Sequence, residues 1–153
     1  MPTEATLFRL VVDANVIVRG VLSSTGASAL LLTALRRRRC ILISSRIHLS
    51  EIHRVLSRPR FVRRYGVTSR RRRRLLARLY TLSFFVQPVG RLTLCRDSSD
   101  DYLIEMALLG QATHLISEDK DLHEDPNIVE FLRQNGIQLV RVGAFVQTLA
   151  LAG

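Results

Sequence analysis

The sequence predicts an α/β fold, a three-layer sandwich in which helices cover both faces of a central, mostly parallel five-stranded sheet. Its length of 153 residues is typical of one domain, and apolar residues make up 47% of it, enough for a buried core. Short β-rich runs also alternate with helical patterns, as they do in βαβ units. We see no repeat or linker, and therefore expect one domain over residues 1–153.

The expected strands are five short runs rich in β-forming residues. They cover 7–12, 40–43, 84–89, 114–116 and 137–140. The first run is almost entirely apolar, as is typical of a strand that is covered on both faces.

The expected helices lie between these runs, where apolar residues recur at helical spacing. They cover 27–39, 45–57, 69–82, 101–109, 127–134 and 144–150, with a further short helix at 14–19 that Asp13 would cap. Gly110 and Gly136 follow two of these segments and are suitable C-terminal stops.

The net charge of +10 is unevenly distributed along the chain. Residues 14–96 carry a net +18 with Glu51 as their single acid, whereas residues 97–153 carry a net −7. This division predicts a basic surface beside an acidic patch, and a basic surface attracts polyanions such as nucleic acids. A GC-rich coding bias alone would explain why 22 of the 23 basic residues are Arg.

Several classes of protein are not favoured by the composition. No apolar run is long enough to cross a bilayer, and the N-terminus lacks the pattern of a secretory signal. Two cysteines, Cys40 and Cys95, suit a reducing cytoplasm. No Gly-rich phosphate loop supports a nucleotide cofactor. We expect a cytoplasmic protein that is not associated with a membrane.

Acidic residues occupy the positions where active sites form in parallel sheets, beyond the carboxyl ends of the strands. Asp13 directly follows the first strand, and Asp119 lies three residues after the fourth. Asp101 opens the helix that precedes the fourth strand and is the preferred third acid, with Asp97 and Asp100 as alternatives.

Glu51 is placed on the apolar stripe of its predicted helix, four residues from both Ile47 and Val55. A carboxylate in such a setting needs a cation, a hydrogen-bond partner or a proton. A salt bridge with Arg54 or another Arg is one alternative, and a metal ion is another.

Each of the other acids also has a purely structural interpretation, as a helix cap or as a solvated turn residue. Together they favour a metal site, because clustered carboxylates repel one another unless a hard divalent cation such as Mg²⁺ or Mn²⁺ binds them. Two such ions about 3.5–4 Å apart can activate water and stabilise the leaving oxygen of a phosphodiester.

Four stretches carry a family resemblance. They are residues 11–16 (VVDANV), Glu51, residues 100–104 (DDYLI) with Ala107, and residues 115–122 (LISEDKDL). In combination and order they resemble the PIN-domain ribonucleases, specifically the bacterial group described as toxins of VapBC-type toxin–antitoxin systems. Residues 136–145 also resemble the last strand and helix of that group, so the resemblance covers nearly the whole chain.

The resemblance implies a PIN-like fold and a metal-dependent endoribonuclease that acts as the toxin of a toxin–antitoxin pair. It implies that Asp13, Glu51, Asp101 and Asp119 hold one or two Mg²⁺ or Mn²⁺ ions, with Asp121 as a further acid. Asn15 and Ser117 would orient the first and fourth acids. The chain has Ser-Glu-Asp where the family more often has Thr-Gly-Asp before the fourth acid.

Arginine clusters are the expected RNA-binding residues: Arg36, Arg37, Arg38, Arg39, Arg71, Arg72 and Arg74. Contact with an antitoxin and simple solvation are the alternatives. The family often forms homodimers, but no segment of the sequence indicates such a surface.

Two other functions fit parts of the pattern. One is a basic module that binds RNA or DNA without cutting it, and the other is an Asp-dependent phosphoryl-transfer protein. Lys120 lies inside the motif of the fourth acid and not at the late position that the second alternative needs.

Overall fold

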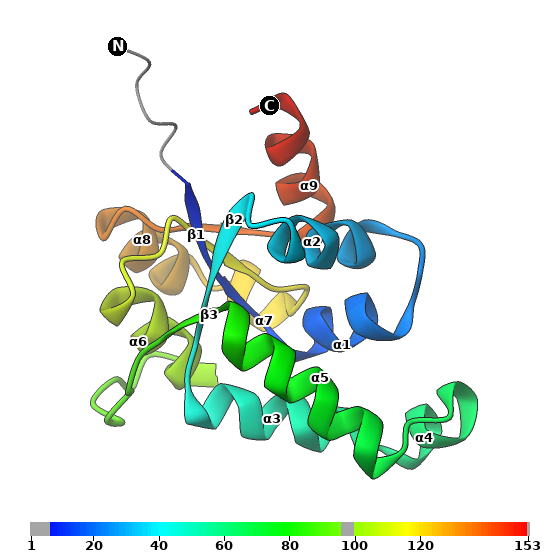
Figure 1. Ribbon diagram of the computed structural model, residues 1–153. Helices are drawn as coiled ribbons and strands as arrows, with labels where there is room; N and C mark the ends of the chain where they lie inside the picture. The colour runs from blue at the N-terminus through cyan, green and yellow to red at the C-terminus, as the bar shows by residue number, and fades with distance from the viewer. Residues whose placement is uncertain (1–6, 96–99, 153) are drawn as a thin grey trace.

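A computed structural model describes residues 7–95 and 100–152 and contains a five-stranded sheet in the order β3-β2-β1-β4-β5 (Figure 1). Every neighbouring pair of strands is parallel. The strands are β1 (Phe8–Val12), β2 (Cys40–Ser44), β3 (Ser83–Phe85), β4 (His114–Ile116) and β5 (Gln138–Val140). The predicted α/β class is therefore confirmed.

All helices but the last connect consecutive strands, as expected of a parallel sheet, and the last follows β5. They are α1 (Ala14–Leu22), α2 (Ala27–Arg36), α3 (Arg46–Leu56), α4 (Pro59–Tyr65), α5 (Ser69–Leu82), α6 (Asp101–Leu109), α7 (Lys120–His123), α8 (Pro126–Gln134) and α9 (Val142–Leu151). The sequence patterns predict neither α4 nor α7. These helices have seven and four residues, too few for apolar periodicity to reveal them.

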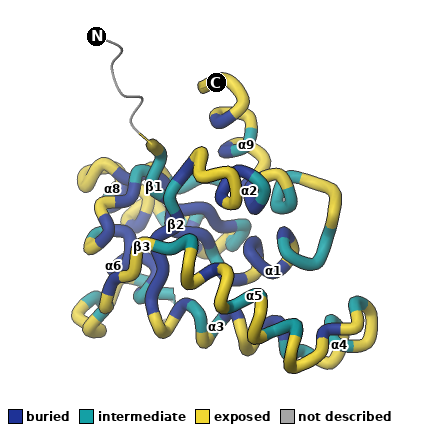
Figure 2. Tube along the Cα trace, viewed as in Figure 1, coloured by how far each residue is buried: buried dark blue, intermediate teal, exposed yellow. Residues whose placement is uncertain are grey.

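The sheet separates two apolar cores, which Figure 2 shows as the buried interior of the chain. Leu10 and Val12 of β1 point to one face, where α1, α2, α3, α5 and α9 pack. Val11 points to the other face, against α6, α7 and α8. All three residues have 0% exposure, which explains the continuous apolar run of β1.

The strand order reverses at β1, because β2 and β3 lie on one side of it and β4 and β5 on the other. Val12 is in register with Ile116 of β4, and the backbone N–H of Asp13 donates to the Ile116 carbonyl at 2.9 Å. This reversal makes the carboxyl ends of β1 and β4 the place where an open α/β sheet forms its binding crevice.

Helices α1 and α2 pack closely at Gly20. A Cβ atom at this position would lie 2.6 Å from the backbone oxygen of Ser28, so any larger side chain would push the helices apart. The contact holds the first turn of α2 against α1.

Strand β3 ends at Phe85, earlier than the predicted 84–89. Pro88 lacks an N–H for further pairing, and Gly90 has a φ of 77°. The chain therefore leaves the edge of the sheet here.

No single helix among the described residues is long and apolar enough to cross a membrane; α1 and α2, bent by 88°, satisfy that test together by length and composition alone.

Candidate active site

A pocket of about 400 Å³ lies at the carboxyl ends of β1 and β4 and is rich in acids. It is lined by Asp13, Asn15, Val16, Arg19, Glu51, Arg54, Asp100, Tyr102, Glu118 and Asp119. The structure thus brings together Asp13, Glu51 and Asp119 from three separate segments, as expected. The third expected acid, Asp101, is not in this lining, and its neighbour Asp100 is.

Asp13 caps the N-terminus of α1 and is held by two donors. The Asn15 backbone N–H donates to its Oδ1 at 3.3 Å, and the Ser117 hydroxyl donates to its Oδ2 at 2.9 Å. Burial raises the pKa of Asp13 above its ordinary value; these hydrogen bonds partly oppose the rise, and the charges of Asp119 and Glu51 add to it. The site is therefore one where a cation would stabilise the ionised carboxylate.

Ser117 connects the first and fourth acids. It is completely buried, and its hydroxyl both donates to Asp13 and accepts the backbone N–H of Asp119 at 3.1 Å. His123 fixes this segment further, because its Nε2 donates to the Ser117 carbonyl at 2.7 Å. The structure thus gives Ser117 the contacts of an orienting residue, whereas Asn15 contacts Asp13 through its backbone.

Asp119 and Asp121 line different pockets. Asp119 lines the acidic pocket, and its Oδ1 accepts the Asp121 backbone N–H at 2.9 Å, which caps α7. Asp121 is exposed and lies beside Glu124 and Asp125, outside the pocket lining. The additional acid expected from the resemblance is therefore not brought to the cluster.

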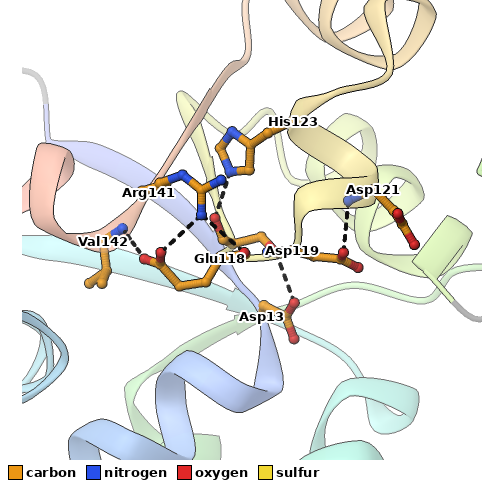
Figure 3. A network of polar contacts seen from close by, with 8 residues as sticks. Asp13, Glu118, Asp119, Asp121, His123, Arg141 and Val142 are labelled. Carbon is orange, nitrogen blue, oxygen red and sulfur yellow. Dashed lines mark hydrogen bonds and ion pairs between the residues drawn. The ribbon is translucent and has the colours of Figure 1, made fainter.

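Glu118 lines the pocket but has a structural partner on α9. Its carboxylate accepts the Val142 backbone N–H at 2.8 Å and pairs with Arg141 at 3.3 Å (Figure 3). These contacts join the end of β4 to the start of α9.

Glu51 forms an ion pair with Arg54, one of the two alternatives that the sequence leaves open. Arg54 Nε lies 3.0 Å from Glu51 Oε2, and a second nitrogen contacts the other oxygen. The hydrogen bond from Arg54 is the main cause that lowers the pKa of Glu51. Exposed ion pairs of this kind contribute only about 0–1 kcal/mol to the stability of a protein. Glu51 can therefore exchange Arg54 for another cation with little loss of stability.

Asp101 is buried and serves as an acceptor for the loop before α6. Its Oδ1 accepts the backbone N–H groups of Leu94 at 3.0 Å and Cys95 at 2.7 Å. One turn later, the buried carboxylate of Glu105 holds the same loop through the N–H groups of Val89 and Gly90. Two acids on α6 thus position this loop.

Because successive helical residues differ by about 100° in direction, Asp100 and Asp101 face different surroundings. Asp100 is the N-cap position of α6 and faces the pocket, whereas Asp101 faces the loop. Asp97, the other alternative, lies outside the described residues.

The predicted arginine cluster at Arg36, Arg37, Arg38 and Arg39 is exposed but distant from the pocket. It immediately precedes Cys40, the first residue of β2, and therefore lies at the amino end of the sheet. A strand of five residues spans about 17 Å. This cluster cannot contact the same phosphate group as Asp13.

Arg71 and Arg72 bind backbone carbonyl groups of their own segment. Arg71 donates to the Tyr65 carbonyl at 2.8 Å and Arg72 to the Val67 carbonyl at 3.2 Å. Arg74 is exposed. Two of the three arginines expected on α5 therefore stabilise the α4–α5 connection.

The arginines that line the acidic pocket are Arg19 and Arg54. Sequence reasoning missed Arg19, because a single arginine in the apolar helix α1 does not form a cluster. One feature of the sequence does indicate that Arg19 lies near the site: it is in the last turn of a helix that begins directly after Asp13.

His48 links the elements that carry Asp13 and Glu51. It is completely buried; its Nε2 donates to the Val12 carbonyl at 2.7 Å, and its Nδ1 lies 2.8 Å from the Ser44 hydroxyl. The carbonyl acceptor requires a proton on Nε2, and Nδ1 then accepts from Ser44. This contact fixes α3, and with it Glu51, relative to the end of β1.

The donor set of the pocket fits a hard divalent cation, because its acids offer carboxylate oxygens and the charges of Asp119 and Glu51 raise the pKa of Asp13. Within the described ranges, no three His, Cys, Asp or Glu side chains converge closely enough to hold a metal ion as they stand. Glu51 is turned to Arg54, and Asp119 caps α7. Metal binding would therefore involve side-chain rotation.

A comparison with models of protein families identifies the family of this chain. The model described as PIN domain matches residues 9–121, more than half of the chain, from β1 through the last of the predicted acids. The chain belongs to the PIN domain family. Searches among curated proteins and among solved structures gave no significant match. PIN domains are typically nucleases and generally use divalent metal ions. Membership of the family therefore makes the chain a nuclease-type hydrolase.

We predict that His48 makes this PIN domain less stable in mild acid. Burial lowers the pKa of His48 to about 4, whereas in the unfolded chain it is near 6.5. Between these values the unfolded chain binds more protons, so the free energy of unfolding falls as the pH drops. From pH 7 to pH 4.5 the His48 contribution should be roughly 2–3 kcal/mol.

Urea unfolding of the wild type and of His48→Gln at both pH values measures this effect. Gln retains a donor for the Val12 carbonyl but does not titrate. From pH 7 to pH 4.5 the free energy of unfolding of the variant should therefore fall by roughly 2–3 kcal/mol less than that of the wild type. An equal fall in both proteins would show that His48 is not the titrating group.

A second prediction separates the two acids at the start of α6. Asp100→Asn should weaken Mn²⁺ binding at least about tenfold, as measured by calorimetry, because it removes a charged oxygen ligand from the pocket. Asp101→Asn should leave Mn²⁺ affinity nearly unchanged, since its amide oxygen can still accept the Leu94 and Cys95 N–H groups. The reverse pattern would show that Asp101 is the ligand.

Proposed function

We propose that this protein is a metal-dependent endoribonuclease that hydrolyses phosphodiester bonds of RNA, and that it acts as the toxin of a toxin–antitoxin pair. The observation that carries the enzymatic part is the partly buried Asp13 carboxylate, which shares one pocket with Glu51, Asp100 and Asp119 at the carboxyl ends of β1 and β4. A basic module that only binds nucleic acid has no use for this acidic pocket.

The residues that would hold one or two Mg²⁺ or Mn²⁺ ions are Asp13, Asp100 and Asp119, with Glu51 as a ligand or as the base that orients water. Asp100 replaces Asp101 in this proposal because it lines the pocket. When bound, the metal supplies Lewis acidity that makes water a nucleophile near neutral pH and offsets the charge of the phosphate.

The other residues of the pocket position these acids and the substrate. Ser117 keeps Asp13 and the backbone of Asp119 in a fixed relation. Arg19 and Arg54 lie in the same lining and can bind phosphate oxygens, for which the guanidinium group is well suited. When a phosphate or metal enters, Arg54 can move from Glu51 to the substrate.

Tyr102 provides a neutral hydroxyl in the pocket. Burial, together with the charges of Asp13 and Glu51, raises the pKa of Tyr102 above its ordinary value. Its phenol therefore keeps its proton and can donate a hydrogen bond to a phosphate oxygen.

RNA as the substrate and the toxin role are supported by the resemblance in the four motifs and by the net charge of +10. A cognate antitoxin and a homodimer follow from the same resemblance alone, and we propose both as partners on that basis.

The enzymatic proposal predicts cleavage of single-stranded RNA by the purified protein in the presence of Mn²⁺ or Mg²⁺ and none in excess EDTA. Asp13→Asn should reduce the rate by about 100-fold or more, because it removes a ligand charge at the centre of the site. Asp121→Asn is the matched control and should cleave at nearly the wild-type rate, since Asp121 lies outside the pocket.

Binding of RNA by the wild type without cleavage under either metal would favour the non-catalytic module instead.

The wild type and Asp13→Asn also test the toxin role in cells. Induced expression of the wild type should arrest bacterial growth and that of Asp13→Asn should not; normal growth with the active enzyme would contradict the toxin role alone.

A further inference from the structure

A second pocket adjoins the acidic one and shares Arg19 with it. It measures about 250 Å³ and lies between the end of α1, the start of α2 and the side of α4. Arg19 and Leu22 of α1 line one side of it, and Phe61 and Tyr65 of α4 contribute aromatic rings to the lining.

The two aromatic rings lie one helical turn apart on α4. Their centroids are 6.3 Å apart with an interplanar angle of 41°, and both residues are half-buried. Arg71 fixes the end of this helix by donating to the Tyr65 carbonyl at 2.8 Å. In sequence order the tyrosines are too scattered to predict a stacking surface, but the fold brings Tyr65 together with Phe61 and Arg19.

Positive charge surrounds these rings. The guanidinium carbon of Arg60 lies 5.0 Å from the centroid of Phe61, and that of Arg64 lies 5.4 Å from the centroid of Tyr65. Arg58 precedes α4 and is close enough to Glu51 to lower its pKa. Apart from Glu51, residues 14–96 contain no acid. The pocket therefore favours a ligand with a planar ring and adjacent negative charge.

We propose that this pocket is a base-binding subsite, which seats one unpaired base of a single-stranded RNA while an adjacent phosphate lies in the acidic pocket. Arg19 would contact the backbone between them, since it lines both pockets. The proposal rests on the proposed function for its substrate. It adds the position at which the strand is held and the requirement that the base be unpaired.

The size and chemistry of the pocket suit one base. Its volume is slightly below the range of about 300–1,000 Å³ for pockets that hold drug-sized ligands. Aromatic rings and Arg side chains are the groups on which proteins stack unpaired bases. Thr25 and Ser28 place hydroxyl-bearing side chains in the lining, where the polar edge of a base needs partners.

The test measures binding of a fluorescently labelled single-stranded RNA hexamer by anisotropy in EDTA, where no cleavage occurs. Tyr65→Leu should raise the Kd about tenfold, because stacking contributes about 1–3 kcal/mol per base. Tyr65→Phe keeps the ring and should stay within twofold of the wild type. Tyr80→Leu is the matched control, an exposed tyrosine that lines a different groove on α5.

A duplex RNA of the same length should bind Tyr65→Leu as well as it binds the wild type, because its bases are not available for stacking. A Kd for Tyr65→Leu within twofold of the wild type, or an equal loss in Tyr80→Leu, would overturn the subsite. Photo-crosslinking of 4-thiouridine RNA to wild-type protein gives an independent measurement: adducts should map to Phe61 or Tyr65, and adducts confined to other segments would also overturn it.

These results are separable from the proposed function. If binding depends on Tyr65 but the wild type cleaves nothing with Mn²⁺ or Mg²⁺, the subsite stands and the nuclease proposal fails. If the wild type cleaves RNA but Tyr65→Leu binds normally, the nuclease proposal stands and the subsite fails.

Discussion

The partial burial of the Asp13 carboxylate is the constraint on which the rest of the site depends. β1 lies between β2 and β4 and is covered on both faces, so the residue that follows it emerges half-buried at the edge of the core. Ser117 and the backbone of Asn15 satisfy its oxygens, yet its pKa remains raised. The charges of Asp119 and Glu51 raise it further, and the proposed metal would offset all three carboxylates.

Much of the fold could be predicted because buried parallel strands form continuous apolar runs. The ends of the same runs are enough to predict that Asp13 and Asp119 lie at one end of the sheet. The choice between Asp100 and Asp101 could not be made from the sequence, since a change of one residue at a helix start rotates the side chain by about 100°. Helices α4 and α7 were missed because they are too short for periodicity to indicate them.

The arginines show how composition and position differ in what they predict. Clustering in the sequence predicted that Arg36–Arg39 and the arginines of α5 bind RNA. The fold places the first group at the amino end of the sheet, away from the pocket. In α5, Arg71 and Arg72 donate to backbone carbonyl groups. The pocket receives single arginines, Arg19 and Arg54. Net charge therefore predicts a polyanionic ligand, whereas the strand order indicates the crevice in which we propose that it binds. Membership of the PIN domain family agrees with the acidic pocket as that place.

The central claim is that the carboxylates at the ends of β1 and β4 form a divalent metal site. A crystal structure from Mn²⁺-soaked crystals, with anomalous diffraction to locate manganese, tests it most directly. We expect manganese bound to Asp13 and Asp119, with Asp100 or Glu51 completing the protein ligands. Manganese bound at Asp101, or only beside Asp121, Glu124 and Asp125, with none at Asp13, would contradict the claim.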